Sequence, residues 1–193
     1  MSSSDNFDTI DQVLAALYAR QPESKIEARL DPTKRLVDLM GSPQANYKII
    51  HITGTNGKTS IARITERLLR EHGLRTGRLT SPHLVKFNER IALDGEPVED
   101  QRIIDAFQEN LPLIDLVDQE LELAGEAALT FFEVFTALAF HVFSDAPIDV
   151  LVLEVGIGGL WDATNVADAD VAVFGSIALD HQKTLGETVE EIA

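Results

Sequence analysis

A strand, a glycine-rich turn and a helix follow one another over residues 48–60, KIIHITGTNGKTS, and this order strongly constrains the fold. The β-branched apolar run predicts a buried strand over 48–53, and an amphipathic helix begins at Lys58. The glycines let the backbone turn tightly around an anion, which the free amides and the dipole at the helix start attract. We therefore predict an ATP phosphate site formed by Gly54, Thr55, Asn56, Gly57, Lys58, Thr59 and Ser60.

The turn is a shortened variant of the common phosphate-binding loop. The general pattern has its first glycine where this chain has Ile52, and only two residues separate Gly54 from Gly57. In such loops the lysine, here Lys58, reaches the β- and γ-phosphates, and a hydroxyl of one of the next two residues lies near Mg²⁺. A glycine-rich turn alone is often only a turn, but the order strand, turn, Gly-Lys-Thr and helix favours ATP and Mg²⁺ as ligands.

The composition is that of a soluble protein with one domain over residues 1–193, of which 45% are hydrophobic and 25% charged. No apolar run approaches the roughly 20 residues of a membrane span, and the opening MSSSDNFD lacks the features of a secretory signal. A net charge of −16 argues against nucleic acid as a partner, because phosphate backbones attract basic surfaces. The absence of cysteine excludes disulfides, thiolate metal sites and cysteine nucleophiles, and it fits a cytoplasmic protein.

Strands and helices alternate along the chain, which predicts an α/β fold with a mainly parallel sheet, right-handed crossovers and flanking helices. The predicted strands cover 48–53, 75–80, 148–155 and 170–179, with a short hairpin strand at 90–93 in a loop over 81–95. An opening helix is predicted from the helical spacing of Ile10, Val13, Leu14 and Leu17. Further helices are predicted over 32–40, 58–71, 98–119 and 130–143, and from Gly186 onward.

For four of these predicted elements, the sequence also indicates a kink, a degree of burial or a buried face. Pro112 should break or kink its helix. The helix over 130–143 is apolar almost all round, so it should be buried on both sides, with its phenylalanines mainly in the core. The continuous apolar run over 148–155 is typical of a central parallel strand. One face of the helix after the glycine-rich turn should be formed by Ile61, Ile64 and Leu68.

Ligands of open parallel sheets bind beyond the carboxyl ends of the strands. Two further predicted strands of this chain end near side chains that could bind a ligand or a metal ion. One strand brings Glu154, and the next leads to His181. A carboxylate that ends an apolar strand is costly to bury unless it meets a cation or a donor, and Mg²⁺ at ATP sites takes one or two carboxylates. We therefore favour Glu154 as a metal ligand over a structural salt bridge, whereas His181 stays open between a site residue and an ordinary histidine.

Five segments of the chain form a recognisable series: TGTNGKTS (53–60), TSPHLVKFNERI (80–91), TFFEVFTALAF (130–140), LEVGIGGLWDATN (153–165) and SIALDHQKTLG (176–186). Together they resemble the folylpolyglutamate synthase / dihydrofolate synthase family of Mur-ligase-like, ATP-dependent amide ligases. The resemblance covers nearly the whole chain in collinear order. TSPHL…NERI and DATN are specific to this branch, whereas the Gly-Lys-Thr start is shared with the cell-wall Mur ligases. The resemblance implies a P-loop-containing fold similar to the central domain of those ligases.

The resemblance also implies a reaction that forms an amide. The carboxylate of the substrate would attack the γ-phosphate of ATP to give an acyl phosphate, and the amine of L-glutamate would then displace phosphate. Dihydropteroate would become dihydrofolate in this way, and a reduced folate would gain a γ-linked glutamate. This agrees with the residues described above, which offer a phosphate site and metal ligands but no obvious enzymic nucleophile.

Roles for single residues follow from the same resemblance. The residues implied as catalytic are Lys58, Glu154 and His181, and those implied as magnesium ligands are Ser81, Glu154 and His181. Phe132 would stack on the pterin, and Asp162 would accept hydrogen bonds from its N–H groups. The loop over 81–91 would close over the substrate, with contacts from Ser81, Pro82, His83 and Arg90.

Two departures from the family pattern matter. Leu160 stands where the family usually has arginine, which affects one basic contact near the pterin or the loop. The sequence ends at Ala193, before a segment whose lysine is carbamylated in relatives. The resemblance therefore implies that residues 1–193 form an N-terminal ATP- and folate-binding domain without the glutamate-binding C-terminal domain. We expect this chain not to turn over by itself. The full-length relatives are usually monomeric, whereas this chain should self-associate, or be less stable than the full-length protein, through an exposed face with Ile192, Val189 and parts of 170–179.

Two other functions are alternatives to the ligase, and the residues argue against the first of them. A cell-wall Mur ligase acting on UDP-muramyl substrates would need an N-terminal UDP-binding domain, and the roughly 50 residues before the turn are too few. A non-catalytic nucleotide- or pterin-binding module is favoured by the missing domain and by Leu160. Within the family, the sequence does not distinguish a dihydrofolate synthase, a folylpolyglutamate synthase or an enzyme with both activities.

Overall fold

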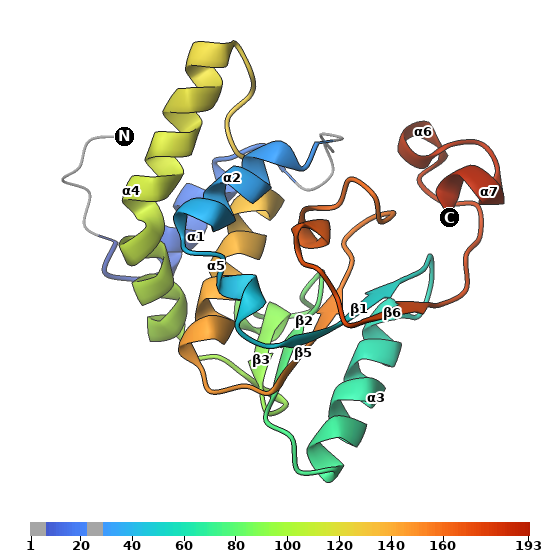
Figure 1. Cartoon of the computed structure of the whole chain (residues 1–193). Helices are drawn as coiled ribbons and strands as arrows, with labels where there is room; N and C mark the ends of the chain where they lie inside the picture. Colours follow the sequence, from blue (N-terminus) through green and yellow to red (C-terminus); the bar gives the residue numbers. More distant parts are fainter. Residues whose placement is uncertain (1–6, 23–28) are drawn as a thin grey trace.

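The computed structural model describes residues 7–22 and 29–193. Its central element is a mixed, six-stranded sheet (Figure 1). Its strands are β1 (Lys48–Thr53), β2 (Thr76–Leu79), β3 (Ile91–Leu93), β4 (Glu96–Pro97), β5 (Val150–Glu154) and β6 (Val171–Phe174). They lie in the order β4-β3-β2-β5-β1-β6, in which β2, β5, β1 and β6 are parallel and β3 and β4 form an antiparallel edge. The predicted mainly parallel sheet and the central place of β5 are confirmed.

The longer helices cover the two faces of the sheet. The helices are α1 (Ile10–Tyr18), α2 (Asp31–Leu39), α3 (Lys58–Glu71), α4 (Asp100–Ala124), α5 (Phe131–Asp145), α6 (Gln182–Leu185) and α7 (Val189–Ile192). Figure 1 shows α3 on one side of the sheet and α5 on the other, and α1, α2 and α4 pack around α5. Within the described ranges, no helix is long and apolar enough to span a membrane.

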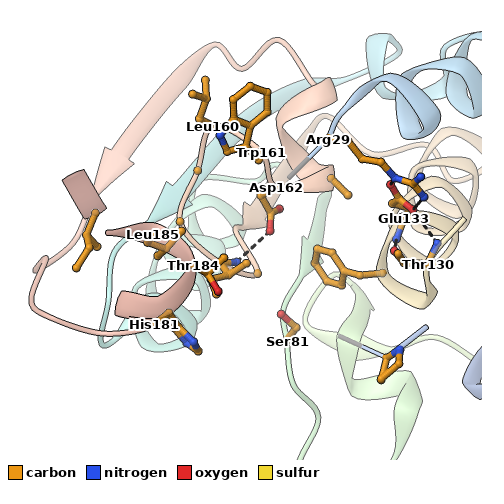
Figure 2. A pocket seen from close by; sticks show the side chains of 18 of the residues that line it. Arg29, Ser81, Thr130, Glu133, Leu160, Trp161, Asp162, His181, Thr184 and Leu185 are labelled. Atoms are coloured by element: carbon orange, nitrogen blue, oxygen red, sulfur yellow. Dashed lines mark hydrogen bonds and ion pairs between the residues drawn. The ribbon is translucent and has the colours of Figure 1, made fainter. Parts of the chain in front are cut away.

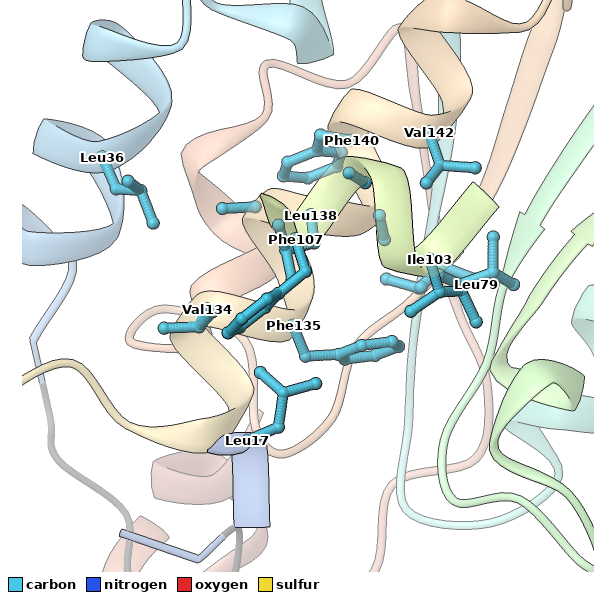
Figure 3. Packing of buried hydrophobic residues seen from close by; sticks show 14 of the residues in the cluster. Leu17, Leu36, Leu79, Ile103, Phe107, Val134, Phe135, Leu138, Phe140 and Val142 are labelled. Atoms are coloured by element: carbon cyan, nitrogen blue, oxygen red, sulfur yellow. The ribbon is translucent and has the colours of Figure 1, made fainter. Parts of the chain in front are cut away.

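The main core is centred on α5 (Figure 3). Phe107 of α4 and Leu17 of α1 join this cluster from one side, and Leu79 of β2 joins it from the sheet. The buried phenylalanines of α5 are Phe131, Phe135, Phe140 and Phe143. The expectation that this helix is buried on both sides is confirmed. A capping box between Thr130 and Glu133 fixes its first turn, which faces the pocket described below.

Several element boundaries differ from the prediction. α4 continues through Pro112 to Ala124, so the proline does not end the helix. β6 ends at Phe174 rather than at 179, because its partner strand β1 ends at Thr53 and the next residues follow the glycine-rich turn, where Ser176 forms an isolated bridge with Asn56. No single helix begins at Gly186, since this residue separates α6 from α7 at a φ of 127°.

The predicted apolar face of α3 is confirmed only for Ile61, which packs against the small buried cluster of Ile52, Ala62 and Val152. Ile64 and Leu68 are 61% and 58% exposed, and the residues that α3 buries fully are Ala62 and Glu66. Glu66 can be buried because it forms an ion pair with Arg78 of β2, which hydrophobic spacing does not reveal.

The surface expected to be exposed near the end of the chain is found in part. Val189 is 40% exposed, and Val171 and Phe174 on the edge strand β6 are 49% and 65% exposed. Ile192 is buried, against the prediction, because α7 packs back against α6 and Ile192 faces the pocket described below. Self-association through this surface stays a prediction.

Candidate active site

The glycine-rich turn between β1 and α3 has a backbone conformation that favours glycine. Gly54 and Gly57 have φ angles of 145° and 78°. A Cβ on Gly54 would lie 3.1 Å from the Cα of Gly175, so the turn also lies tightly against the segment that follows β6. Gly57 has no side chain to cap α3, which leaves the first amides of this helix available to an anion in the turn.

Lys58, Thr59 and Glu154 form a polar cluster beside this turn. Lys58 donates from Nζ to the Gly54 carbonyl at 2.8 Å. The Thr59 hydroxyl lies 2.8 and 3.0 Å from the two carboxylate oxygens of Glu154. Glu154 reaches the cluster because alternate residues of β5 face opposite sides of the sheet, and Val152, two residues earlier, packs on the α3 side. The structure thus brings the predicted metal ligand next to the predicted phosphate site.

The cluster fits a magnesium ion. Glu154 is 2% exposed; burial raises its pKa, while the Thr59 hydroxyl, the Lys58 charge and the Ser81 N–H favour the ionised form. A cation would offset the burial of this carboxylate. Mg²⁺ at nucleotide sites needs only one or two protein carboxylates, because phosphates and water complete its shell. Across residues 7–22 and 29–193, no group of three or more His, Asp or Glu side chains could hold a metal ion.

His181 lies at the start of α6, on a more exposed segment. Its side chain is 58% exposed, and its Nε2 lies 3.8 Å from a carboxylate oxygen of Asp180. It lines a small cavity of about 30 Å³ together with Gly54, Thr55 and Lys58. The structure therefore places His181 beside the turn, with its imidazole next to the carboxylate of Asp180.

A larger pocket of about 800 Å³ adjoins this cavity, within the size range of sites for small organic ligands. The residues that line both are Gly156, Ile157, Gly158, His181, Leu185, Ile192 and Ala193. Figure 2 shows Leu160, Trp161 and Asp162 on one wall of the larger pocket and Arg29, Thr130 and Glu133 on another. The predicted site residues that line it are Ser81, Pro82, Phe132, Asp162 and His181.

Phe132 and Asp162 meet at Gly156. A Cβ at this position would lie 2.8 Å from Cζ of Phe132 and 2.9 Å from Oδ2 of Asp162, so only glycine fits without a shift. Asp162 is 4% exposed, and its carboxylate accepts the N–H groups of Ile157 and Thr164, both at 3.0 Å. Burial raises the pKa of Asp162, and these hydrogen bonds oppose the rise. The carboxylate thus closes the loop over residues 156–162, which forms one wall of the pocket.

His83 and Arg90, also predicted to contact substrate, are not among the residues that line either cavity. Arg90 is 4% exposed and donates from Nε to Nδ1 of His83 at 2.9 Å. Its guanidinium lies 5.5–5.6 Å from the ring centroids of Phe87, Phe131 and Phe135. Arg90 does not reach the substrate pocket because it lies in this aromatic environment, where cation–π contacts hold its guanidinium inside the core.

Sequence reasoning missed three features of the site. Arg29 makes a two-point ion pair with Glu133, at 3.0 and 3.1 Å, on the pocket wall. Trp161 is 52% exposed at the pocket. His51 contacts Thr164, which in turn contacts Asp162. The Thr-x-x-Glu pattern at 130–133 was a readable helix cap, but its partner Arg29 lies 104 residues away in sequence.

Comparison with known proteins agrees with this geometry, although no family model matches the chain. The dihydrofolate synthase/folylpolyglutamate synthase of Mycobacterium tuberculosis is 46% identical over 192 residues, which cover 98% of this chain and 39% of that protein. The folylpolyglutamate synthase of Lacticaseibacillus casei is 41% identical over 158 residues, covering 82% of this chain and 36% of the relative. The chain thus spans about two fifths of the length of these relatives.

Solved structures give the same result for the fold. The structure of Mycobacterium tuberculosis folylpolyglutamate synthase complexed with ADP superposes with a TM-score of 0.88 and 45% identity, covering 97% of this chain and 41% of that one. E. coli FolC in complex with DHPP and ADP superposes with a TM-score of 0.85 and 34% identity, over 98% of this chain and 43% of that one. On both sequence and structure, the chain belongs to the folylpolyglutamate synthase / dihydrofolate synthase family.

Proposed function

We propose that this chain forms the ATP- and folate-binding part of a ligase that joins L-glutamate to dihydropteroate or to a reduced folate. The observation that carries the proposal is the contact between the two cavities. The phosphate turn lines one, the predicted pterin residues line the other, and His181 and the 156–158 backbone line both. A substrate carboxylate and a terminal phosphate could therefore meet without either ligand leaving its site.

The residues beside the turn would prepare ATP for attack. Lys58 would exchange its bond to the Gly54 carbonyl for phosphate oxygens, and the first amides of α3 would hold the same charge. Glu154, Thr59 and Ser81 would hold Mg²⁺, which neutralises phosphate charge when bound. The substrate carboxylate attacks the γ-phosphorus and ADP leaves, giving an acyl phosphate. The glutamate amine then attacks the acyl carbon, phosphate leaves, and the nitrogen loses a proton.

The larger pocket would bind the pterin-bearing substrate. Phe132 offers an aromatic face, and Asp162 offers a carboxylate beside it, which suits a flat ring system with N–H donors. ADP and DHPP are named as ligands in the structures of relatives, and these names support the same two ligand classes here. The relatives reported above are folate enzymes, so the cell-wall ligase alternative has no observation in its favour.

The nucleotide half of the proposal is tested by Lys58→Ala. We expect ATP affinity to fall by roughly tenfold or more, because a charged hydrogen bond to phosphate is worth about 1.5–3 kcal/mol. Thermal unfolding should not change, because Lys58 lies at the helix start and not in the core. Lys34→Ala, on the exposed side of α2, is the control. Equal ATP affinity of the Lys58→Ala variant and the unsubstituted chain would overturn the phosphate site.

Turnover is a separate question. An assay of this chain with ATP, Mg²⁺, dihydropteroate and L-glutamate measures amide formation directly. We predict no product at a rate near that of the full-length relatives, because residues 1–193 correspond to only about two fifths of the length of those relatives. Product at such a rate would show that residues 1–193 are sufficient.

A further inference from the structure

A chain of hydrogen bonds leads from β1 into the wall of the larger pocket. Nε2 of His51 lies 2.8 Å from the hydroxyl oxygen of Thr164, and that oxygen lies 2.5 Å from Oδ1 of Asp162. Thr164 is fully buried and Asp162 nearly so. Sheet geometry brings His51 and Thr164 together. His51 points to the same face of the sheet as Ile49, and α5 and Thr164 lie on that side.

The partners fix the direction of these hydrogen bonds. Oδ1 of Asp162 also accepts the Thr164 N–H, and Oδ2 accepts the Ile157 N–H, so the carboxylate acts as an acceptor. The single hydroxyl proton of Thr164 then points at Asp162. The oxygen of Thr164 must accept from His51, which places the imidazole proton on Nε2.

Asp162 controls the shape of the loop over 156–162. Its carboxylate binds Ile157 near the start of the loop, and its own N–H donates to the Gly159 carbonyl at 3.2 Å. Trp161 and Leu160 stand at the pocket on this loop. A change in the orientation of Asp162 would therefore move the wall that faces the substrate.

We propose that His51 is a positioning residue for the substrate pocket. Through the Thr164 hydroxyl it holds Asp162, and with it the 156–162 loop, in the shape that receives the aromatic part of the substrate. The relay also fastens this wall to β1, the strand that carries the phosphate turn. The substrate part of the inference rests on the proposed function; the relay itself rests on the geometry alone.

The variants that test the relay come in matched pairs. Thr164→Val removes the hydroxyl at nearly constant volume, and Thr164→Ser keeps it. His51→Phe removes the ring donor, and His51→Gln keeps an N–H donor. Trp161 is the only tryptophan in the sequence, so its fluorescence reports on the loop itself. We expect Thr164→Val and His51→Phe each to raise acrylamide quenching of Trp161 about twofold and to weaken dihydropteroate binding about tenfold, with ATP affinity unchanged. Thr164→Ser and His51→Gln should show only a small part of either effect.

A measurement on the unsubstituted chain guards against variants that do not fold. Ring ¹⁵N NMR at pH 7 should show His51 neutral, with its proton on Nε2. A proton on Nδ1, or unchanged Trp161 quenching in folded Thr164→Val and His51→Phe variants, would overturn the relay. If the unsubstituted chain binds no dihydropteroate, the proposed function and the substrate part of this inference both fail. The quenching and NMR results would still decide the relay.

Discussion

Single residues at this site combine burial with charge in a way that favours ligands. Glu154 is a carboxylate at the end of an apolar strand, and without partners its charge would be costly there. The Thr59 hydroxyl and the Lys58 ammonium reduce that cost, and a bound cation would reduce it further. The same residue was predictable from sequence, because a charged residue that ends an apolar strand is rarely without a partner.

Glu154→Gln tests this balance. The amide keeps the shape and can still accept from Thr59, but it loses the charge that a magnesium ion needs. We expect the Mg²⁺-dependent part of ATP affinity to fall by about tenfold or more. Stability should stay equal or rise, because burial disfavours the carboxylate. ATP titration with and without Mg²⁺, alongside thermal unfolding, measures both effects. Glu122→Gln on the exposed side of α4 is the control, and an unchanged Mg²⁺ effect in Glu154→Gln would contradict the assignment.

His51 gives the fold a defined pH dependence. Burial lowers its pKa from 6.5 to about 4, so between these values the unfolded chain binds a proton that the folded chain does not. The stability that neutral His51 contributes is full above pH 6.5 and is lost as the pH falls toward 4. Relative to His51→Gln, the unsubstituted chain should lose about 2 kcal/mol between pH 7 and pH 5. Urea unfolding at both pH values measures this, and a constant difference would be evidence against it.

At the scale of helices and strands, features set by neighbouring residues could be predicted from the sequence, whereas contacts between residues far apart in the sequence could not. The strand, turn and helix over 48–71 were predicted correctly, because their glycines, β-branched residues and helical spacing all act locally. The buried face of α3 was predicted correctly only for Ile61, because the burial of Glu66 depends on its ion pair with Arg78 of β2. His51 and Thr164 are 113 residues apart in sequence, so only the folded sheet brings them together.

The ion pair between α3 and β2 allows a prediction about that packing. The side chains of Glu66 and Arg78 are 1% and 5% exposed, and the Thr76 hydroxyl also donates to Glu66 at 3.2 Å. Arg78→Met should destabilise the fold by about 3 kcal/mol, because it leaves the buried Glu66 carboxylate with only the Thr76 hydroxyl and a longer contact to Arg70, at 3.8 Å. Adding Glu66→Leu should recover most of the loss. Urea unfolding of the two single variants and the double variant forms the cycle, and a loss below about 1 kcal/mol in Arg78→Met would refute the prediction.

At the scale of the whole molecule, parallel strands bring distant segments of the chain to one edge. The turn after β1, the loop after β5 and the segment after β6 meet there, as expected for an open parallel sheet. This convergence made the general place of the site predictable from sequence. The shape of the larger pocket was not predictable from sequence. Its walls include Arg29, Trp161 and residues of α7, and no local sequence pattern indicates that these come together.

Two adjoining ligand sites are tested most directly by asking whether ATP and dihydropteroate bind this chain at the same time. Dihydropteroate is titrated against Trp161 fluorescence, with and without saturating ATP and Mg²⁺, for the unsubstituted chain and for Lys58→Ala and Phe132→Leu. We expect saturable dihydropteroate binding that ATP does not displace. Lys58→Ala should lose only ATP, and Phe132→Leu should lose mainly dihydropteroate. Displacement of one ligand by the other, or loss of both ligands in either folded variant, would contradict two adjoining sites.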